Sequence, residues 1–306
     1  MNRAKVILNP YAGRWLAQSQ RGVVENELQA AGIDYDITST DGPGHGTQLA
    51  RDAVEQGYSP VIAAGGDGTI SEIVNGMLQA SGERDTPPLG IIPLGSANDL
   101  VINLGLPVDI AQSIQVISAG HQRKIDIGEV SFGEPPQKRY FDNNSAIGLE
   151  PTVTLIQQSM TNLRGILRYV IASVRGIMMN PSWQIQLEWD GGQYAGPITL
   201  VTVGNCPLTG GLYMAPNANP YDGKLTFVYG FMSSRMQMLM LLPKTMKPGP
   251  GNYIEHPNIH QVHTEWLRIR LETPTPLHAD GEIQTEEATQ VSYTIYPARL
   301  PVLLPR

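Results

Sequence analysis

Two glycine-rich turns, each lying between an apolar run and a helical pattern, have the residue types best suited to phosphate chemistry. Residues 65–69 read GGDGT, and residues 93–100 read PLGSANDL about 30 positions later. Glycines let the backbone approach phosphate oxygens, and a following helix N-terminus offers free N–H groups and a positive dipole end. An acidic residue beside such a cradle, as Asp67 is, generally requires a metal ion. The turns therefore predict a site for nucleotide phosphates and a divalent cation.

A purely structural interpretation exists for each turn. In the first, Thr69 and Glu72 have the spacing of a capping box. In the second, Ser96 has the residue type of an N-cap, and Asp99 would favour the helix dipole. In a parallel sheet, however, both turns would lie at the carboxyl ends of strands, where open α/β sheets bind ligands, and this favours the functional interpretation.

Two shorter segments add candidate chemistry. Residues 9–14, NPYAGR, follow the first apolar run, and Arg14 could contact a phosphate or be an ordinary surface charge. Near the C-terminus, Asp280 and Glu282 flank Gly281. Asp-Gly is a typical hairpin turn, so this segment could be structural, or it could present two carboxylates to the site.

The elements that must position these residues differ between the two halves of the chain. In the first half, strand-like runs alternate with helical patterns of about ten residues, which indicates βαβ units and a mainly parallel sheet. After about residue 126, short alternating runs separated by turn signals indicate an antiparallel β-rich region with two helical segments. The expected strands are 4–8, 33–38, 60–64, 89–92, 183–189, 198–203, 225–229 and 267–271, and the expected helices are 20–31, 47–56, 71–79, 161–179 and 233–246.

Composition excludes several classes of protein. The chain has 306 residues and a formal net charge of −7, which argues against sequence-independent binding of nucleic acid. Its one cysteine, Cys206, cannot form an internal disulfide, and no apolar run approaches the length needed to span a bilayer. The N-terminus does not have the pattern of a signal peptide. We therefore expect a cytoplasmic protein whose membrane contact is peripheral.

Taken in order, NPYAG, GGDGTISEIVNG, PLGSANDL and HADGE resemble the signature series of the diacylglycerol kinase catalytic-domain family, which includes soluble bacterial lipid kinases. KIDIG at 124–128, FDNNSAIGLE at 141–150 and APNANPYDGKL at 215–225 are similar to further family blocks. The resemblance implies ATP and Mg²⁺ as cofactors and a lipid as substrate. It also implies the fold class α/β plus β. A phosphofructokinase-like α/β nucleotide-binding domain would comprise residues 1–126 plus 286–306, and an antiparallel β-sandwich-like lipid-substrate domain with two helices would comprise 127–285.

The resemblance also implies roles for individual residues. Asp280 matches the proposed general base, and Asp67, Asp99 and Glu282 match the rest of the catalytic acidic set. With Asp126, the last three would organise the catalytic Mg²⁺, largely through water. The positions that match nucleotide contacts are Asn9, Thr40, Gly65, Gly66, Gly68, Thr69, Ser96 and Asn98.

Three positions depart from the family pattern. Ser96 stands where Thr is usual and Leu100 where Phe is usual, and both keep the relevant hydroxyl or apolar contact. Some members hold a structural Mg²⁺ in the block that here reads APNANPYDGKL. Asp222 is the one carboxylate left in it, which puts that second metal site in doubt.

The sequence is less specific about the molecule that would accept the phosphate. Residues 231–246 are rich in methionine, which suits a lipid-binding surface, and residues 160–179 form an amphipathic pattern with arginines on its flanks. For both segments, an ordinary packed helix is the favoured interpretation.

Alternatives to diacylglycerol as acceptor are a sphingoid base, phosphatidylglycerol or NAD. NAD kinases share GGDGT, but PLGSANDL argues against them. A regulator that has lost catalysis is disfavoured because all the acidic positions are present, and a homodimer stays open.

Overall fold

The computed structural model describes residues 3–13, 15–160, 165–179 and 181–306. Arg14 and part of the arginine-flanked segment, residues 161–164, lie outside the described residues. The chain divides into two compact units, unit 1 comprising Met1–Ile127 with Pro297–Arg306 and unit 2 comprising Gly128–Tyr296. Within the described ranges, no helix is both long and apolar enough to cross a membrane. The assignment of nucleotide and lipid roles to separate domains stays a prediction.

Unit 1 is built on a parallel sheet, as the alternating pattern predicted. Its strand order is β16-β4-β3-β1-β2, and every neighbouring pair runs parallel. Because these strands are parallel, the turns that follow them meet at one edge of the sheet. The strands are β1 (Ala4–Leu8), β2 (Tyr35–Ser39), β3 (Val61–Gly65), β4 (Leu89–Pro93) and the end of β16 (Glu282–Leu303).

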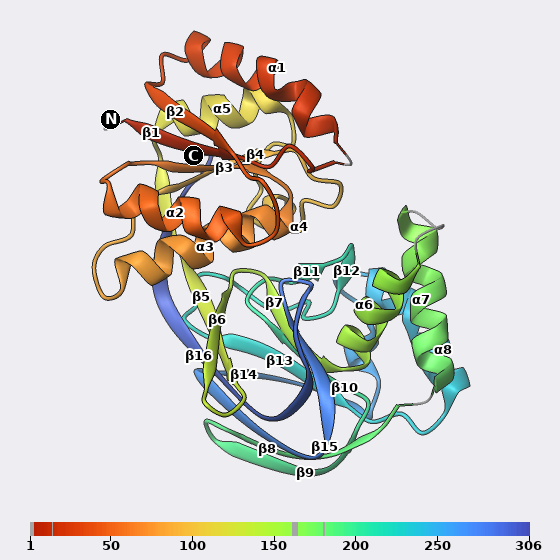
Figure 1. The fold of residues 1–306 in the computed structure, drawn as a ribbon. Coiled ribbons are helices and arrows are strands. Elements are labelled where there is room, and N and C mark those ends of the chain that lie inside the picture. The colour runs from red at the N-terminus through yellow and green to blue at the C-terminus, as the bar shows by residue number, and fades with distance from the viewer. Residues whose placement is uncertain (1–2, 14, 161–164, 180) are drawn as a thin grey trace. The chain divides into compact units, whose positions relative to one another are not determined.

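Helices cover both faces of this sheet. Figure 1 shows α1 (Leu16–Ala30) and α5 (Ile110–Ala119) on one face, and α2 (His45–Glu55) and α3 (Asp67–Ser81) on the other. Alternate residues of β1, β3 and β4 therefore pack on α1 and α5 in one core cluster. All five residues of β3 are buried, as expected for a strand enclosed on both faces. A short helix, α4 (Asp99–Asn103), follows the second glycine turn.

Unit 2 is antiparallel and sandwich-like, again as predicted. Its main strand order is β14-β13-β10-β7-β15-β16, with β8-β9 attached to β15, and β5 paired with β16 and β6. The long strand β15 pairs with β8 through its first half and with β7 through its second, and its register with β16 shifts between Arg270 and Thr275. The sheet thus folds over a core of inward-facing apolar residues. The strands are β5 (Gln122–Phe132), β6 (Gln137–Phe141), β7 (Asn144–Gly148), β8 (Trp183–Trp189), β9 (Gly192–Ile198), β10 (Leu200–Gly204), β13 (Leu225–Gly230), β14 (Ile259–Thr264) and β15 (Trp266–Ala279), and β11 (Leu208–Thr209) pairs with β12 (Leu212–Tyr213) apart from them.

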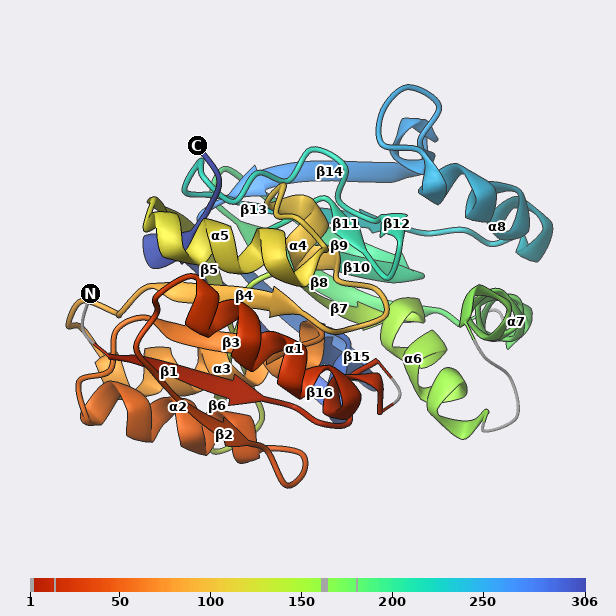
Figure 2. The same ribbon diagram turned by 90° about the horizontal axis from the view of Figure 1, so that it is seen from above.

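Three helices run along one flank of unit 2 (Figures 1 and 2). α7 (Gly165–Met179) and α8 (Arg235–Leu241), which continues into the 3₁₀ helix η1 (Leu242–Met246), correspond to the two predicted helical segments. α6 (Leu149–Ser159) is a further helix that the sequence did not lead us to expect. A second 3₁₀ turn, η2 (Tyr253–Glu255), follows.

The contact between α2 and α3 generates a stability prediction. A Cβ on Gly76 of α3 would lie 2.2 Å from the Thr47 carbonyl oxygen and 2.9 Å from the Ala50 Cβ of α2. Gly76→Ala should therefore force the helices apart and lower the free energy of unfolding by roughly 1–3 kcal/mol. Urea denaturation measures this change.

Gly22→Ala in α1 is the matched control, because a Cβ there meets nothing within 4 Å. It should raise the free energy of unfolding by roughly 0.5–1 kcal/mol, the usual gain from removing a helical glycine. Equal effects of the two substitutions would contradict the close-packing argument.

Candidate functional site

In unit 1 the two glycine turns lie against each other, backbone to backbone. A Cβ on Gly95 would come within 2.5 Å of the Gly66 Cα, and one on Gly66 within 3.0 Å of the Gly95 Cα. The N–H of Leu94 donates to the Gly65 carbonyl at 2.8 Å. Side chains at Gly66 or Gly95 would push the turns apart, so glycine is required for their approach as well as for any approach of phosphate.

The predicted nucleotide residues come together from three strand ends. Asn9, which follows β1, donates its Nδ2–H to the Oγ1 of Thr69 in the first turn of α3 at 2.9 Å. Thr40 follows β2, is buried, and donates its backbone N–H to the Leu8 carbonyl at 2.8 Å. One sheet edge thus gathers Asn9, Thr40 and the turn containing Gly65, Gly66 and Gly68. The nucleotide role of these residues stays a prediction.

Asp67 joins the two turns electrostatically. Burial raises the pKa of its carboxyl above the ordinary value, and backbone N–H groups that include those of Leu100 and Asn98 partly offset the effect. The Leu100 N–H lies 3.3 Å from Asp67 Oδ1. Asp99, in the first turn of α4, is also buried.

The local capping interpretations of both turns are wrong. α3 begins at Asp67 with Gly66 as N-cap, so Thr69 lies inside the helix. Glu72 instead accepts the N–H groups of Gly44 and Gly46 at 2.7 and 2.9 Å and caps α2. The spacing suggested a local partner, but the orphan donors of α2 lie closer to this carboxylate.

In the second turn, Ser96 is exposed and does not cap α4. The N-cap is Asn98, in a left-handed conformation with φ 54°. Its Nδ2–H donates to the Gly95 carbonyl at 3.2 Å, which holds the turn closed from within.

Asp126 and Asp222 have evident structural contacts. The buried Asp126 accepts the N–H of Ala298 at 2.7 Å and so holds the segment that returns to unit 1. Asp222 is exposed, and its carboxylate accepts the N–H of Lys224 at 3.0 Å. Over the part of the chain that the structure describes, no three His, Cys, Asp or Glu side chains are grouped so as to hold a metal ion. The metal roles of both residues stay predictions.

In unit 2, Asp280 lies in the predicted hairpin turn, which is confirmed. β15 ends at Ala279 and β16 begins at Glu282, and both turn residues are left-handed, with φ 48° at Asp280 and 77° at Gly281. The Asp280 carboxylate accepts three successive backbone N–H groups, those of Asp142, Asn143 and Asn144, at 3.2, 3.0 and 3.1 Å. Its own N–H donates to the Asn144 carbonyl at 2.7 Å. These bonds hold the carboxylate at a defined point.

Glu282 has a different environment. It is part-exposed and forms an ion pair with Arg139, whose Nη2 lies 3.4 Å from Glu282 Oε2. The hairpin thus presents one carboxylate locked to backbone and one paired with arginine.

A buried network that sequence reasoning missed continues from this turn. The Glu150 carboxylate accepts Asn144 Nδ2–H at 2.8 Å and the Thr202 hydroxyl at 2.6 Å, and it lies 3.2 Å from His278 Nε2. The Gly281 N–H lies 3.4 Å from His278 Nδ1, so the imidazole connects the hairpin turn to Glu150. Glu150 and Asp280 therefore share Asn144 as a partner.

The charge state of Glu150 follows from these bonds. Burial alone would raise the pKa of its carboxyl, but the hydrogen bond and charge of His278, with hydrogen bonds from Thr202 and Asn144, outweigh burial and hold this pKa below the ordinary value. Glu150 is therefore a buried carboxylate at neutral pH.

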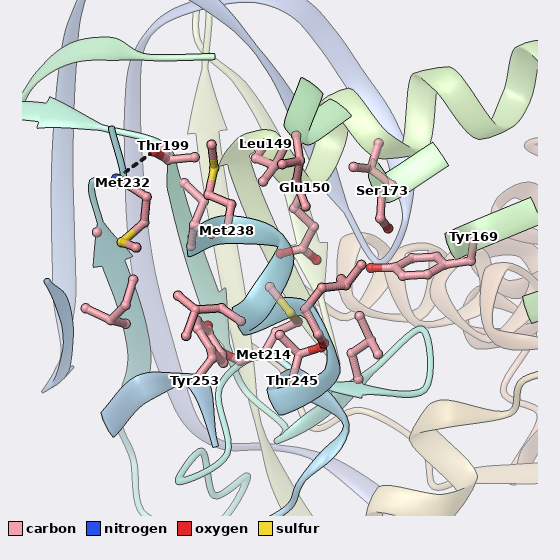
Figure 3. A pocket seen from close by; sticks show the side chains of 18 residues that line it. Leu149, Glu150, Tyr169, Ser173, Thr199, Met214, Met232, Met238, Thr245 and Tyr253 are labelled. Atoms are coloured by element: carbon pink, nitrogen blue, oxygen red, sulfur yellow. Dashed lines mark hydrogen bonds between the residues drawn. The ribbon is translucent and has the colours of Figure 1, made fainter. Parts of the chain in front are cut away.

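Glu150 also lines an apolar cavity of unit 2 (Figure 3). The cavity measures about 700 Å³ with its open mouth. Glu150 has its hydrogen-bond partners, but the buried Ser173 Oγ, which also lines the cavity, has no hydrogen bond. A largely apolar hollow with few polar groups is the usual form of a site for a small molecule. Its walls include Leu149, Val153, Tyr169, Ile177, Met214, Met232, Met238, Leu241, Leu242, Tyr253 and Ile259.

Sequence comparison identifies relatives along the whole length of the chain. Residues 3–130 match the family model described as diacylglycerol kinase catalytic domain, and residues 144–304 match the YegS C-terminal NAD kinase beta sandwich-like domain. A diacylglycerol kinase of Staphylococcus saprophyticus is 30% identical over 284 residues, which cover 92% of this chain and 88% of the relative.

Solved structures show the same fold. A diacylglycerol kinase from Bacillus anthracis superposes with a TM-score of 0.75 at 21% identity, covering 99% of this chain and 97% of the other. A yeast NADH kinase complexed with NADH superposes with a TM-score of 0.55 at 10% identity, covering 100% of this chain and 84% of that one. The architecture is thus shared beyond recognisable sequence similarity.

The Glu150 network generates a prediction about pH. A carboxylate whose pKa is lowered by folding stabilises the protein at neutral pH, and this contribution is lost as the pH falls through the folded-state value. Glu150→Gln should lower the free energy of unfolding at pH 7 by roughly 1–3 kcal/mol and reduce its acid dependence. Urea denaturation across pH, followed by tryptophan fluorescence, measures both.

Glu188→Gln is the control, since Glu188 is exposed and its nearest cation, Arg268, is 3.9 Å away. It should change neither quantity appreciably. An unchanged pH profile in Glu150→Gln would show that the network does not hold Glu150 ionised.

Proposed function

Because this chain belongs to the diacylglycerol kinase family, we propose that it transfers the γ-phosphate of ATP to the hydroxyl of diacylglycerol, which gives phosphatidate. The assignment of a lipid as phosphate acceptor is supported by the hydrogen bonds that connect the cavity to the hairpin in unit 2. Glu150 lines the apolar cavity, and Asn144 bonds both Glu150 and Asp280. An acyl chain in this cavity would thus lie beside the network that fixes the proposed base.

Asp280 is the general base in this proposal. Its carboxylate accepts the proton of the acceptor hydroxyl while that oxygen bonds to the γ-phosphorus. The bond between the γ-phosphorus and the β–γ bridging oxygen breaks, and ADP leaves with the electron pair. The three backbone N–H bonds to Asp280 support this role because they preset the position of the base.

In unit 1 the proposed nucleotide residues are Asn9, Thr40, Gly65, Gly66, Gly68, Thr69, Ser96 and Asn98. The turns that contain most of them meet backbone to backbone, which leaves glycine surface for a phosphate chain. The part-buried carboxyl of Asp67 fits a nearby cation, because its pKa is raised by burial without an opposing charge among the causes.

The residues proposed to hold Mg²⁺, largely through water, are Asp67, Asp99, Asp126 and Glu282. When bound, the ion would neutralise charge that develops on the phosphates. Mg²⁺ prefers to retain several waters, so indirect contacts to these carboxylates are expected. A structural Mg²⁺ at Asp222 has weaker support, since its carboxylate closes a local turn.

One other acceptor class has a specific observation in its favour. Glu150 is an anion at the cavity wall, and a sphingoid base would bring a cationic amine to it. NAD is disfavoured because the cavity offers few polar groups to a dinucleotide. We place the enzyme in the cytoplasm with peripheral contact to the membrane.

Removing the proposed base should separate turnover from nucleotide binding. Asp280→Asn and Asp280→Ala should lower turnover by roughly 10²- to 10⁴-fold, because the acceptor hydroxyl loses its proton acceptor. ATP affinity, measured by calorimetry, should change little. Radiolabel transfer from ATP into a panel of diacylglycerol, sphingosine, phosphatidylglycerol and NAD, with and without Mg²⁺, measures turnover and names the acceptor.

Asp190→Ala is the matched control, because Asp190-Gly191 forms the exposed turn between β8 and β9 in the same unit. It should leave transfer unchanged. Activity of Asp280→Asn within about tenfold of wild type would remove Asp280 from the role of base. Radiolabelled phosphate found in NAD alone would contradict the assignment of a lipid as acceptor.

Filling the cavity should change acyl-chain preference. Ser173→Phe adds a ring to the wall at the unpartnered hydroxyl, so turnover of long-chain diacylglycerol should fall by roughly tenfold or more relative to a short-chain analogue. Circular dichroism checks that the variant is folded. Equal losses on both substrates in a folded variant would contradict an acyl chain in this cavity.

A further inference from the structure

Exposed apolar side chains of unit 2 are concentrated on one surface. Among the residues that the structure describes, all large hydrophobic side chains of this unit that are exposed lie on α7, α8 and η1. The remaining exposed ones belong to unit 1. We call this set on unit 2 the methionine surface, and its members are Val170, Met178, Met179, Met236, Met240 and Met246.

The same elements form the walls of the cavity. In α8, Met238 and Leu241 line the cavity, while Met236 and Met240, four residues apart, are 64% and 57% exposed. In α7, Tyr169, Ser173 and Ile177 face inward. Apolar groups therefore occupy both the inner and the outer sides of these helices, which a helix with a solvated outer face would not show.

The helices that form this surface carry basic but no acidic side chains, although the chain is acidic overall and Glu255 of η2 packs beside η1. Residues 151–187 and 223–254 contain no Asp or Glu, whereas the whole chain has a net charge of −7. Arg175, Arg235, Lys244 and Lys247 are exposed on or directly beside the same helices. An apolar surface whose helices carry only basic charge is complementary to an anionic lipid bilayer.

We propose that the methionine surface docks unit 2 on anionic membranes, with the methionines entering the lipid and the basic side chains contacting headgroups. The role of this docking rests on the proposed function, because docking would bring the cavity to the lipid substrate of the proposed kinase. Flexible, polarizable methionines suit a fluid partner better than a fixed protein surface.

The test is binding to lipid vesicles without nucleotide. We compare sedimentation of the full chain with vesicles of phosphatidylcholine and with vesicles that also contain phosphatidylglycerol. Met236→Ser/Met240→Ser and Lys244→Gln/Lys247→Gln should each weaken binding to the anionic vesicles by roughly tenfold or more, because apolar insertion and headgroup attraction are lost separately.

Matched control variants lie on unit 1 and at Lys224 of unit 2, which directly precedes β13 and is not on α7, α8 or η1. Ile102→Ser/Val108→Ser removes equally exposed apolar groups, and Lys124→Gln/Lys224→Gln removes two exposed cations. Both should bind like the wild type. Equal losses in test and control variants, or no vesicle binding at all, would overturn the proposal.

A fluorescent probe locates the contact directly. The one cysteine, Cys206, is buried, so Met240→Cys and Val108→Cys can each be labelled selectively with an environment-sensitive dye. Anionic vesicles should shift the emission of the Met240→Cys probe to the blue and leave the Val108→Cys probe unchanged. A shift at both sites or at neither would contradict docking through this surface.

The design separates this proposal from the kinase assignment. Vesicle binding through the methionine surface without phosphate transfer would leave docking intact and reject the lipid kinase. Phosphate transfer to lipid dispersed in detergent, by a protein that does not bind vesicles, would support the lipid kinase and reject docking. Sedimentation velocity tests whether a second copy of the chain packs on the methionine surface instead. The proposal is overturned if the wild type is a dimer, Met236→Ser/Met240→Ser dissociates it, and vesicle binding is unchanged.

Discussion

The bonds from three successive backbone N–H groups to the Asp280 carboxylate are the interaction on which most of unit 2 depends. They join a hairpin turn to a segment more than 130 residues earlier in the chain. Asn144 then extends the connection to Glu150, and Glu150 to Thr202 and His278. Because every one of these groups is buried or part-buried, loss of one partner would leave another unsatisfied, so the arrangement is held as a whole.

Unit 1 depends on a steric constraint of a different kind. Its two glycine turns lie so close that the backbones of Gly66 and Gly95 are in contact. The parallel order of β1, β3 and β4 brings these turns to one edge, and the glycines let them close on each other. Asp67 then serves both turns, since it begins α3 and accepts a backbone N–H from the start of α4.

The helices on the flank of unit 2 reconcile two interpretations that the sequence had left as alternatives. Met238 is packed core, and Met236 and Met240 are exposed, so one short helix is both a cavity wall and an outer apolar surface. The division between packed core and exposed apolar surface is therefore made residue by residue along the same helix. Alternation at helical spacing explains this, since neighbours in sequence point to different sides.

The sequence alone determined the two-part fold class, strands β1 to β4 of unit 1 and four strands of unit 2, the hairpin at Asp280 and the family, because these depend on periodicity, turn chemistry and motif order along the chain. Prediction from sequence failed where a side chain bonds a partner that is distant in the sequence or differs from the one its spacing suggested. The spacing of Thr69 and Glu72 suggested a local cap, yet Glu72 caps α2. Ser96 had the residue type of an N-cap, yet Asn98 holds that position. The Glu150–His278 pair and the cavity left no local signal, since their members are brought together only when the antiparallel strands of unit 2 pair across 50 to 130 residues of chain. Tertiary structure decided them because buried polar groups must be satisfied by whichever partner folding brings within reach.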